Sequence, residues 1–209
     1  MLGDTKNRTR DTIGQIGVSP AGPALSQLVE VVRRCNPNLS AIQAISWQVT
    51  GCVETSWQQW LDGLFEPLLL PHLGRVIDLS ARQSSREIIL LDLELDRNLE
   101  PWPRDRSLDA GLRFLQQGSL RAERLMAKLR EAIGNGLAHG HFATLYAVRC
   151  GIFSIPVRTA ILSYVLQELV IGAPGYIQPA KYLEAALASV NEFLRISSGG
   201  LNEGLHSHG

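Results

Sequence analysis

The clearest pattern of apolar and polar positions lies between Leu137 and Gly172, where two helical repeats are joined by a short turn. The first repeat begins near His141. The second begins at Pro156, whose missing N–H suits a first helical turn. Its apolar residues recur with the spacing of one helix face: Val157, Ala160, Ile161, Tyr164, Val165 and Leu169. Because Gly172 and Pro174 are stop signals, the pattern predicts a helical hairpin.

Helical spacing also predicts three helices near the N-terminus. The first runs through Leu25, Leu28, Val29 and Val32. After a break at 36–38, the second covers 39–50 and ends at Gly51. The third is capped by Thr55 or Ser56, and its apolar face holds Trp57, Trp60, Leu61, Leu64, Phe65 and Leu68. We expect Pro67 and Pro71 to kink or restart this helix.

The segment SREIILLDLELD fits two interpretations. Apolar residues alternate with acidic ones, which is typical of a strand. However, Ser84 and Glu87 have the spacing of a capping box, leucine outnumbers β-branched residues, and no partner strand is visible. We therefore predict a helix. The four acidic residues between Asp92 and Glu100 are interpreted as a solvated helix face rather than an acid–base pair.

The remaining pattern completes an all-α fold. EPWPRD at 100–105 is expected to be a linker, and a long helix follows from Ser107 to Ile133 with a bend at Gly118. Pro179 begins a last helix with Leu183, Leu187, Val190 and Leu194 on one face. The sequence thus predicts a single-domain bundle of about eight or nine helices. We expect a disordered leader over 1–20, a helical domain over 21–196 and a flexible tail over 197–209.

Composition narrows the classes of partner. Lys+Arg equals Asp+Glu at 20 each, so no net charge attracts a polyanion and nucleic acid is excluded as an expected partner. The three cysteines form no CxxC pair, which favours reduced thiols over a disulfide framework or a zinc site. The N-terminus has no apolar signal region, and Arg158 and Glu168 interrupt the most apolar run. We expect a cytoplasmic protein that does not enter a membrane.

Candidate chemistry is sparse, and we predict no catalytic, cofactor-binding or metal-binding residue. Two His-x-His pairs, His139/His141 and His206/His208, have a spacing that can chelate a transition metal, although a structural helix start and a solvated tail explain them as well. A Cys150–His141 nucleophile pair is disfavoured because nine residues of helix separate the two side chains. No phosphate-binding loop, dinucleotide fingerprint or zinc-protease motif occurs.

The four tryptophans, Trp47, Trp57, Trp60 and Trp102, admit two explanations. Core packing is the usual reason for tryptophan at helical spacing. An anchor that faces a partner protein is the alternative.

With the helices placed, several stretches resemble UreF, a family of urease accessory proteins. The family's N-terminal helix reads roughly GLE-W-x-V-x-x-G-x-V and is followed by a WL pair. The residues that fall into this frame are Ile45, Trp47, Val49, Gly51, Val53, Trp60 and Leu61. Its R-x-x-S-x-x-x-G-x-x-x-L pattern is matched by Arg104, Ser107, Gly111 and Leu115. The helical hairpin matches without a gap at His141, Phe142, Tyr146, Ile155 and Tyr164.

The chain departs from the family pattern at several positions. Leu69 stands in place of an acid, and Ala143, Ala147 and Ser154 replace a proline and two glycines. The segment NPNLSAIQ at 36–43 replaces the family's LPVGAFSYS loop, and the region over 165–180 is shorter.

The resemblance implies an all-α scaffold that is not an enzyme and needs no cofactor. UreF proteins bind UreD (also called UreH) and the GTPase UreG, usually as dimers, and this assembly delivers Ni²⁺ to apo-urease. The same partners are therefore expected here. Because the departures fall where partner contacts are expected, recruitment of the same fold to another partner remains an alternative. A helical hydrolase or metal enzyme that uses His139, His141 and Cys150 is a third hypothesis.

Overall fold

The computed structural model describes residues 22–37, 46–117, 123–173 and 179–199, and most of these residues are helical. The helices are α1 (Leu25–Cys35), α2 (Val53–Trp60), the π-helix η2 (Leu61–Leu69), α3 (Leu70–Ala81), α4 (Ser85–Asn98), α5 (Pro101–Leu115), α6 (Arg124–Gly134), α7 (Phe142–Ile152), α8 (Val157–Gly172) and α9 (Pro179–Gly199). No strand occurs in these ranges, so the expected all-α class is confirmed. None of the described helices combines the length and apolar character that a membrane span requires.

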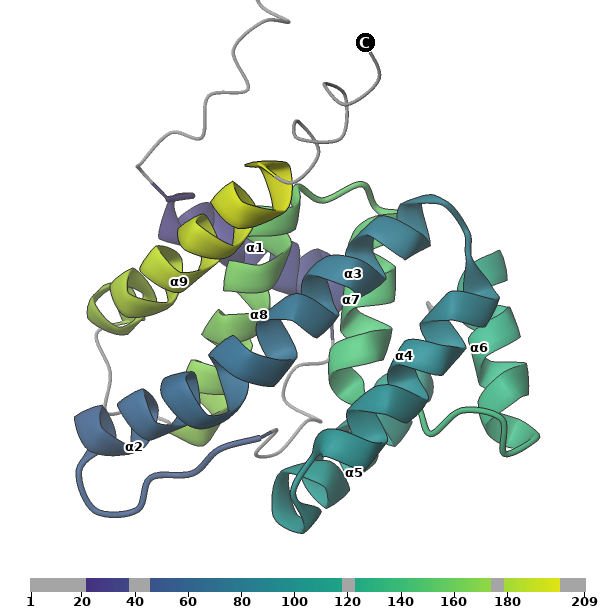
Figure 1. Cartoon of the computed structure of the whole chain (residues 1–209), viewed down its shortest axis with the longest axis horizontal. Helices are drawn as coiled ribbons and strands as arrows, with labels where there is room; N and C mark the ends of the chain where they lie inside the picture. The colour runs from purple at the N-terminus through teal and green to yellow at the C-terminus, as the bar shows by residue number, and fades with distance from the viewer. Residues whose placement is uncertain (1–21, 38–45, 118–122, 174–178, 200–209) are drawn as a thin grey trace, which may run out of the picture.

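Helices α3 and α7 form the centre of the bundle (Figure 1). These two share the most extensive contact, while α8 packs against α1 and α9 on one side and α5 packs against α7 on the other. Residues 142–151 of α7 and 160–169 of α8 are buried without interruption. A helix that is buried all round lies inside the core. The sequence pattern predicted one buried face for the second helix of this hairpin, whereas the structure buries all faces of both helices over these residues.

The hairpin boundaries agree with the sequence pattern. His141 and Pro156 precede the first residues of α7 and α8, and Gly172 is the last residue of α8. Between the two helices Ser154 adopts a left-handed backbone conformation with φ of +53°. This conformation is uncommon for a residue with a side chain and favours glycine. Ser154 therefore belongs to a tight turn, not to a helix interior.

The N-terminal expectations need correction. Residues 46–50 are not helical, so the helix predicted over 39–50 is wrong for that part, and 38–45 lie outside the described residues. Helix α2 begins at Val53 rather than after a Thr55 or Ser56 cap. At Pro67 the chain does not break: the extra residue of each π turn lets η2 run directly into α3, as the proline lacks the N–H that a normal helix needs.

Two further boundaries differ from the pattern. EPWPRD is not a linker, since α5 begins at Pro101 and a proline is tolerated in a first helical turn. The long helix expected over 107–133 is instead the end of α5 and, from Arg124, α6; Gly118 lies outside the described residues. The predicted helix over the SREIILLDLELD segment is confirmed as α4, although the Ser84 side chain makes no capping hydrogen bond. Helix α9 continues to Gly199, past the boundary expected at 196.

Candidate functional site

Asp92 of α4 is buried and holds the segment that leads into α7. One carboxylate oxygen accepts hydrogen bonds from the backbone N–H groups of His139 and Gly140, at 2.7 and 2.8 Å, and the other accepts from the N–H of His141 at 3.0 Å. Gly140 has a φ of +81°, which turns successive N–H groups toward one point. Such an arrangement is an anion-binding nest, and the anion here is a side chain of the same protein.

Helix α5 closes this segment from its other side. A Cβ atom on Gly111 would lie 1.9 Å from the carbonyl oxygen of Gly140, so only glycine permits the contact. The chain between α6 and α7 is thus fixed between an acid on α4 and a glycine on α5.

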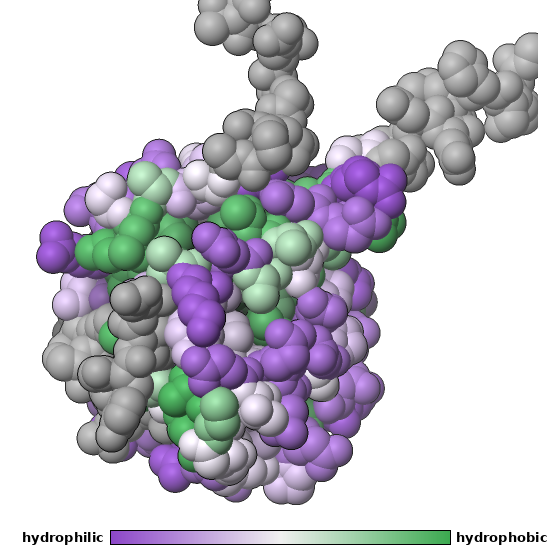
Figure 2. Space-filling view, turned by 90° about the vertical axis from the view of Figure 1, so that its left-hand side faces the viewer, coloured by the Kyte–Doolittle hydropathy of each residue, from purple (hydrophilic) through white to green (hydrophobic). Residues whose placement is uncertain are grey.

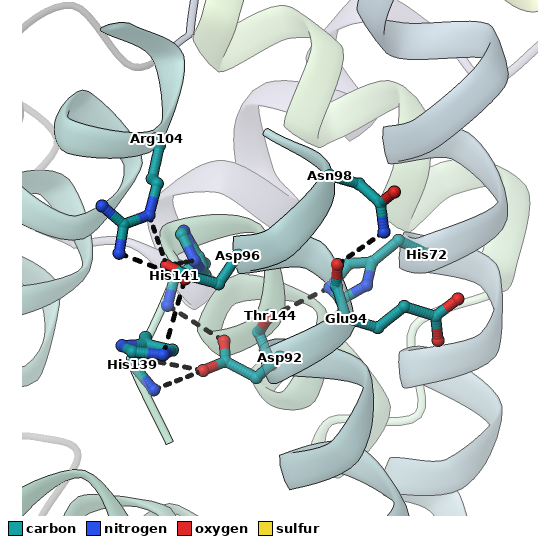
Figure 3. Close-up of polar contacts among 10 residues, drawn as sticks. His72, Asp92, Glu94, Asp96, Asn98, Arg104, His139, His141 and Thr144 are labelled. Carbon is teal, nitrogen blue, oxygen red and sulfur yellow. Dashed lines mark hydrogen bonds and ion pairs between the residues drawn. The ribbon is translucent and has the colours of Figure 1, made fainter. Parts of the chain in front are cut away.

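Asp96 lies one turn beyond Asp92 and joins three basic side chains (Figure 3). Its carboxylate accepts hydrogen bonds from Arg104 Nε and Nη2 at 2.8 and 3.1 Å and from His141 Nε2 at 3.1 Å, while His139 Nε2 lies 3.5 Å away. Burial alone raises the pKa of Asp96, but the hydrogen bond from Arg104 and the neighbouring His139 and His141 outweigh it, and the pKa lies below its usual value. Asp96 is therefore ionised near neutral pH.

His141 is the fully enclosed member of this cluster. Burial lowers the pKa of its imidazole, against the opposing effect of the Asp92 and Asp96 carboxylates. The ring is then neutral at pH 7 and carries its proton on Nε2, which donates to Asp96. Nδ1 is buried and has no hydrogen-bond partner among the described residues. A base in this position cannot reach a substrate, because the side chain has no exposed surface.

A second histidine of the region, His72 of α3, is also neutral. Burial lowers the pKa of His72 to about 4, and its Nε2 lies 3.0 Å from Thr144 Oγ1 on α7. His72 therefore fixes α3 against α7 from within the core. His139, with 42% of its side chain exposed, is the most accessible of the three histidines in the described part of the chain.

The second buried carboxylate belongs to Glu168 of α8. It accepts hydrogen bonds from the Tyr164 hydroxyl at 2.6 Å, the Ser46 hydroxyl at 2.7 Å and the Ser46 N–H at 3.0 Å. Burial raises the pKa of Glu168 to about 7, although the bonds from Tyr164 and Ser46 act in the opposite direction. The carboxylate thereby fastens the segment before α2 to α8.

The tryptophans near Glu168 complete this contact. Trp47 Nε1 donates to the Glu168 carbonyl at 2.8 Å, and Trp60 Nε1 donates to Ser46 Oγ at 3.0 Å. The Trp57 ring lies 5.0 and 4.7 Å from the rings of Trp47 and Trp60. All three are buried, so the core explanation is confirmed for them. Trp102 is half-buried, and the Arg106 guanidinium lies 5.7 Å from its ring centre.

The structure separates the residues of the enzyme hypothesis. His141 Nε2 faces Asp96, whereas Cys150 Sγ faces Cys35 about two and a half turns along α7. Within the described ranges, no group of three His, Cys, Asp or Glu side chains is placed to hold a metal ion. His206 and His208 lie outside those ranges.

The sequence interpretation was wrong about two of the acids. Asp92 and Asp96 do not form a solvated helix face, whereas Glu94 and Glu100 are exposed as expected. The missed signal was periodic: Asp92 lies four residues after Ile88 and three before Leu95, and both of those are buried. An acid in an apolar stripe needs a buried partner.

In comparisons with known protein families, curated proteins and solved structures, none matched this chain.

Proposed function

We propose that this protein is a divergent UreF-like scaffold that acts without catalysis in urease maturation. It bridges a UreD/UreH-type protein and a UreG-type GTPase while Ni²⁺ is inserted into apo-urease. The proposal rests on the sequence resemblance and on the structural roles that its residues take.

The observation that carries the proposal is the backbone at Ser154. The UreF pattern has glycine at this position, and the chain has serine. The serine nevertheless adopts the left-handed conformation, with φ of +53°, for which glycine is suited. The backbone at position 154 thus has the conformation that favours glycine, at the position where the family has glycine. This agreement supports a turn of the same shape between the two helices.

Other resemblance positions also have roles that restrict the residue type. Gly111 touches the Gly140 backbone and admits no side chain. Arg104 binds Asp96, His141 directly precedes α7, and Tyr146 is fully buried. These residues maintain the framework rather than line an open cleft, which favours a scaffold over an enzyme.

An adaptor needs surface that partner proteins can bury. Six large apolar residues are exposed among those described: Leu25, Leu90, Leu112, Leu137, Val170 and Ile196. Leu25 and Val170 flank an apolar groove of about 290 Å³ between α1 and α8. Figure 2 shows apolar patches separated by polar residues on one face of the molecule. Surface of this kind suits protein–protein contact.

The test is deletion and capture in the native host. Deletion of the gene is expected to lower urease activity and the nickel content of urease, and the tagged chain is expected to co-purify UreD/UreH-type and UreG-type proteins. Normal nickel loading in the deletion strain would contradict the proposal.

Variants at the apolar groove can test whether the partner proteins bind there. Leu25→Asp and Val170→Asp place charges beside the apolar groove, and Gln48→Asp changes a residue that is already polar and exposed. If partners bind in the groove, the Leu25 and Val170 variants should keep the helical circular dichroism of the wild type but no longer co-purify the partner proteins. The Gln48 variant should keep both the circular dichroism and the co-purification.

Recruitment of this fold outside the urease pathway is the second candidate. It is favoured by the segment NPNLSAIQ at 36–43, which replaces the family's LPVGAFSYS loop, and by the shorter region over 165–180, since these are places where partner contacts are expected. Gene context separates the two candidates: a genome without urease subunits favours another partner, and a surrounding urease cluster favours the first proposal.

A further inference from the structure

Cys35 and Cys150 meet in the core although 115 positions separate them in the sequence. The Cys150 thiol donates a weak hydrogen bond to Cys35 Sγ, and the two sulfur atoms are 3.7 Å apart. Neither side chain has exposed surface. Cys52, the third cysteine, is exposed and donates to Glu54, so it belongs to a different part of the molecule.

The surrounding contacts hold the two helices together at this point. Cys35 is the last residue of α1, and Cys150 lies near the end of α7. Beside them the Arg34 guanidinium lies 4.6 Å from the ring centre of Phe153. Disulfide formation needs the two sulfur atoms to approach from 3.7 Å to about 2.05 Å. The two thiols are already in contact, and Cys35 is the last residue of α1, where local opening of a helix end gives the sulfur atoms room to approach and admits a small oxidant.

We propose that Cys35 and Cys150 are a latent disulfide pair, which a hydroperoxide oxidises to a covalent link between α1 and α7. This inference concerns the core of the chain and does not depend on the urease proposal. It adds to the expectation of reduced thiols, because the resting pair is reduced and the link forms only on oxidation.

The hydrogen bond between the thiols assigns their order of reaction. Burial, followed by the contact with Cys35, raises the pKa of the Cys150 thiol, so Cys150 stays protonated as the donor. Cys35 is the acceptor of this bond, so its own S–H proton takes no part in it. Cys35 is therefore the first nucleophile and Cys150 the residue that resolves it.

The chemistry balances with one molecule of hydrogen peroxide. The Cys35 thiolate attacks a peroxide oxygen, the O–O bond breaks, and the released hydroxide takes a proton to leave as water, with Cys35 as a sulfenic acid. The Cys150 sulfur then attacks the Cys35 sulfur, and the S–O bond breaks as the hydroxyl leaves with the Cys150 proton as a second water. Two thiols are oxidised to one disulfide, and the peroxide is reduced to two waters.

The experiment uses the full chain carrying Cys52→Ser, which leaves only the proposed pair. Reduced protein is treated with hydrogen peroxide, quenched, unfolded and analysed for free thiols and intact mass. The expected result is loss of both thiols and of two hydrogen atoms, with no added oxygen and no dimer. The oxidised monomer should melt at a higher temperature, and a dithiol reductant should reverse both changes.

Two matched arms separate a native pair from chance oxidation. Cys52→Ser combined with Cys150→Ser removes the resolving thiol, and Cys35 should then be trapped as a sulfenic acid by a dimedone-type reagent, in protein whose circular dichroism is unchanged. The same oxidation in denaturant should form the link more slowly, because unfolding separates the thiols. Oxygen addition without a disulfide, or a link that forms only in denaturant, would overturn the proposal.

Discussion

Two carboxylates, those of Asp92 and Glu168, are buried among the residues that the structure describes, and the protein compensates them in different ways. Asp92 on α4 accepts three backbone N–H groups from one short segment, His139–His141. Glu168 on α8 accepts one backbone N–H and two hydroxyl groups, from Ser46 and Tyr164. The first acid fixes the start of α7, and the second fixes the segment before α2 to α8.

The two acids differ in the kind of donor that surrounds each carboxyl group. Every partner of Asp92 is a backbone donor, the N–H groups of Gly140 and His141 are buried, and the positive end of α7 lies beside the carboxyl group. Glu168 has fewer fixed donors and no exposed surface, so burial dominates and raises its pKa to about 7. Asp92 thus stabilises the fold by accepting from backbone donors, whereas Glu168 is tolerated more easily when it is protonated.

Removal of the Asp92 carboxylate is expected to have the largest effect. Asp92→Ala leaves three backbone N–H groups, two of them buried, without their acceptor and should lower the free energy of unfolding by about 4 kcal/mol, since each donor left unpaired costs roughly 1–3 kcal/mol and the costs are not additive. Chemical denaturation at neutral pH measures the loss. Glu94→Ala, an exposed acid on the same helix, is the control and should change stability by less than about 0.5 kcal/mol. Equal effects of the two variants would contradict the role of Asp92.

The raised pKa of Glu168 predicts that the stability of the protein depends on pH. Its folded pKa of about 7 lies above the usual 4.5, so the folded state binds the proton more tightly than the unfolded state. The resulting contribution is complete below pH 4.5 and is lost as the pH rises through 7, with a total of about 3 kcal/mol at 1.36 kcal/mol for each pH unit.

Glu168→Gln removes this titration and should lack that part of the pH dependence. Urea unfolding of both proteins across this range measures it. The NH₂ group of the glutamine would face the Ser46 N–H, which is also a donor, so the variant is less stable than the wild type at low pH. As the pH rises, the wild type loses stability and the difference between the two proteins becomes smaller. Parallel pH profiles for the two proteins would show that Glu168 does not titrate in this range.

Gly111 tests whether the Asp92 region depends on close backbone contact as well as charge. In Gly111→Ala the new methyl group would lie 1.9 Å from the Gly140 oxygen, so α5 must move away from the segment that Asp92 holds. We expect a loss of about 2 kcal/mol, typical of overpacking. Gly134→Ala is the matched control, because its Cβ meets no atom within 4 Å, and should raise stability by about 0.5 kcal/mol. Thermal unfolding distinguishes the two, and a neutral Gly111 variant would contradict the contact.

The same two regions show how far the sequence could predict this structure. The α7–α8 hairpin could be placed because its boundaries depend on local signals, such as Pro156 and Gly172. The roles of Asp92 and Glu168 could not, since the partners of Asp92 lie more than 40 residues away in the sequence, and Ser46, which donates two of the three hydrogen bonds to Glu168, lies more than 120 residues away. Local periodicity does place both acids on apolar stripes, with Glu168 seven residues after Ile161, and this signal indicates burial without identifying the partner.

The prediction of two helix boundaries was wrong for a related reason. EPWPRD has the composition of a linker, but both of its prolines fall in the first turn of α5, where no N–H is required. In residues 46–50, Ser46 and Trp47 give their polar groups to Glu168 rather than to a helix. Tertiary hydrogen bonds therefore outweighed the local helical pattern.

The smallest expected effect concerns the turn between α7 and α8. This turn connects the helix that follows the Asp92-bound segment to the helix that carries Glu168. Ser154→Gly should stabilise the protein by roughly 0.5 kcal/mol, because relief of the left-handed conformation exceeds the added flexibility of the unfolded chain. Ala147→Gly, the other position where the UreF pattern has glycine, should destabilise by about 1 kcal/mol or more, since Ala147 is buried within α7. Differential scanning calorimetry resolves the opposite signs. If both variants destabilise, the turn does not require glycine, and the observation that carries the UreF-like proposal loses its force.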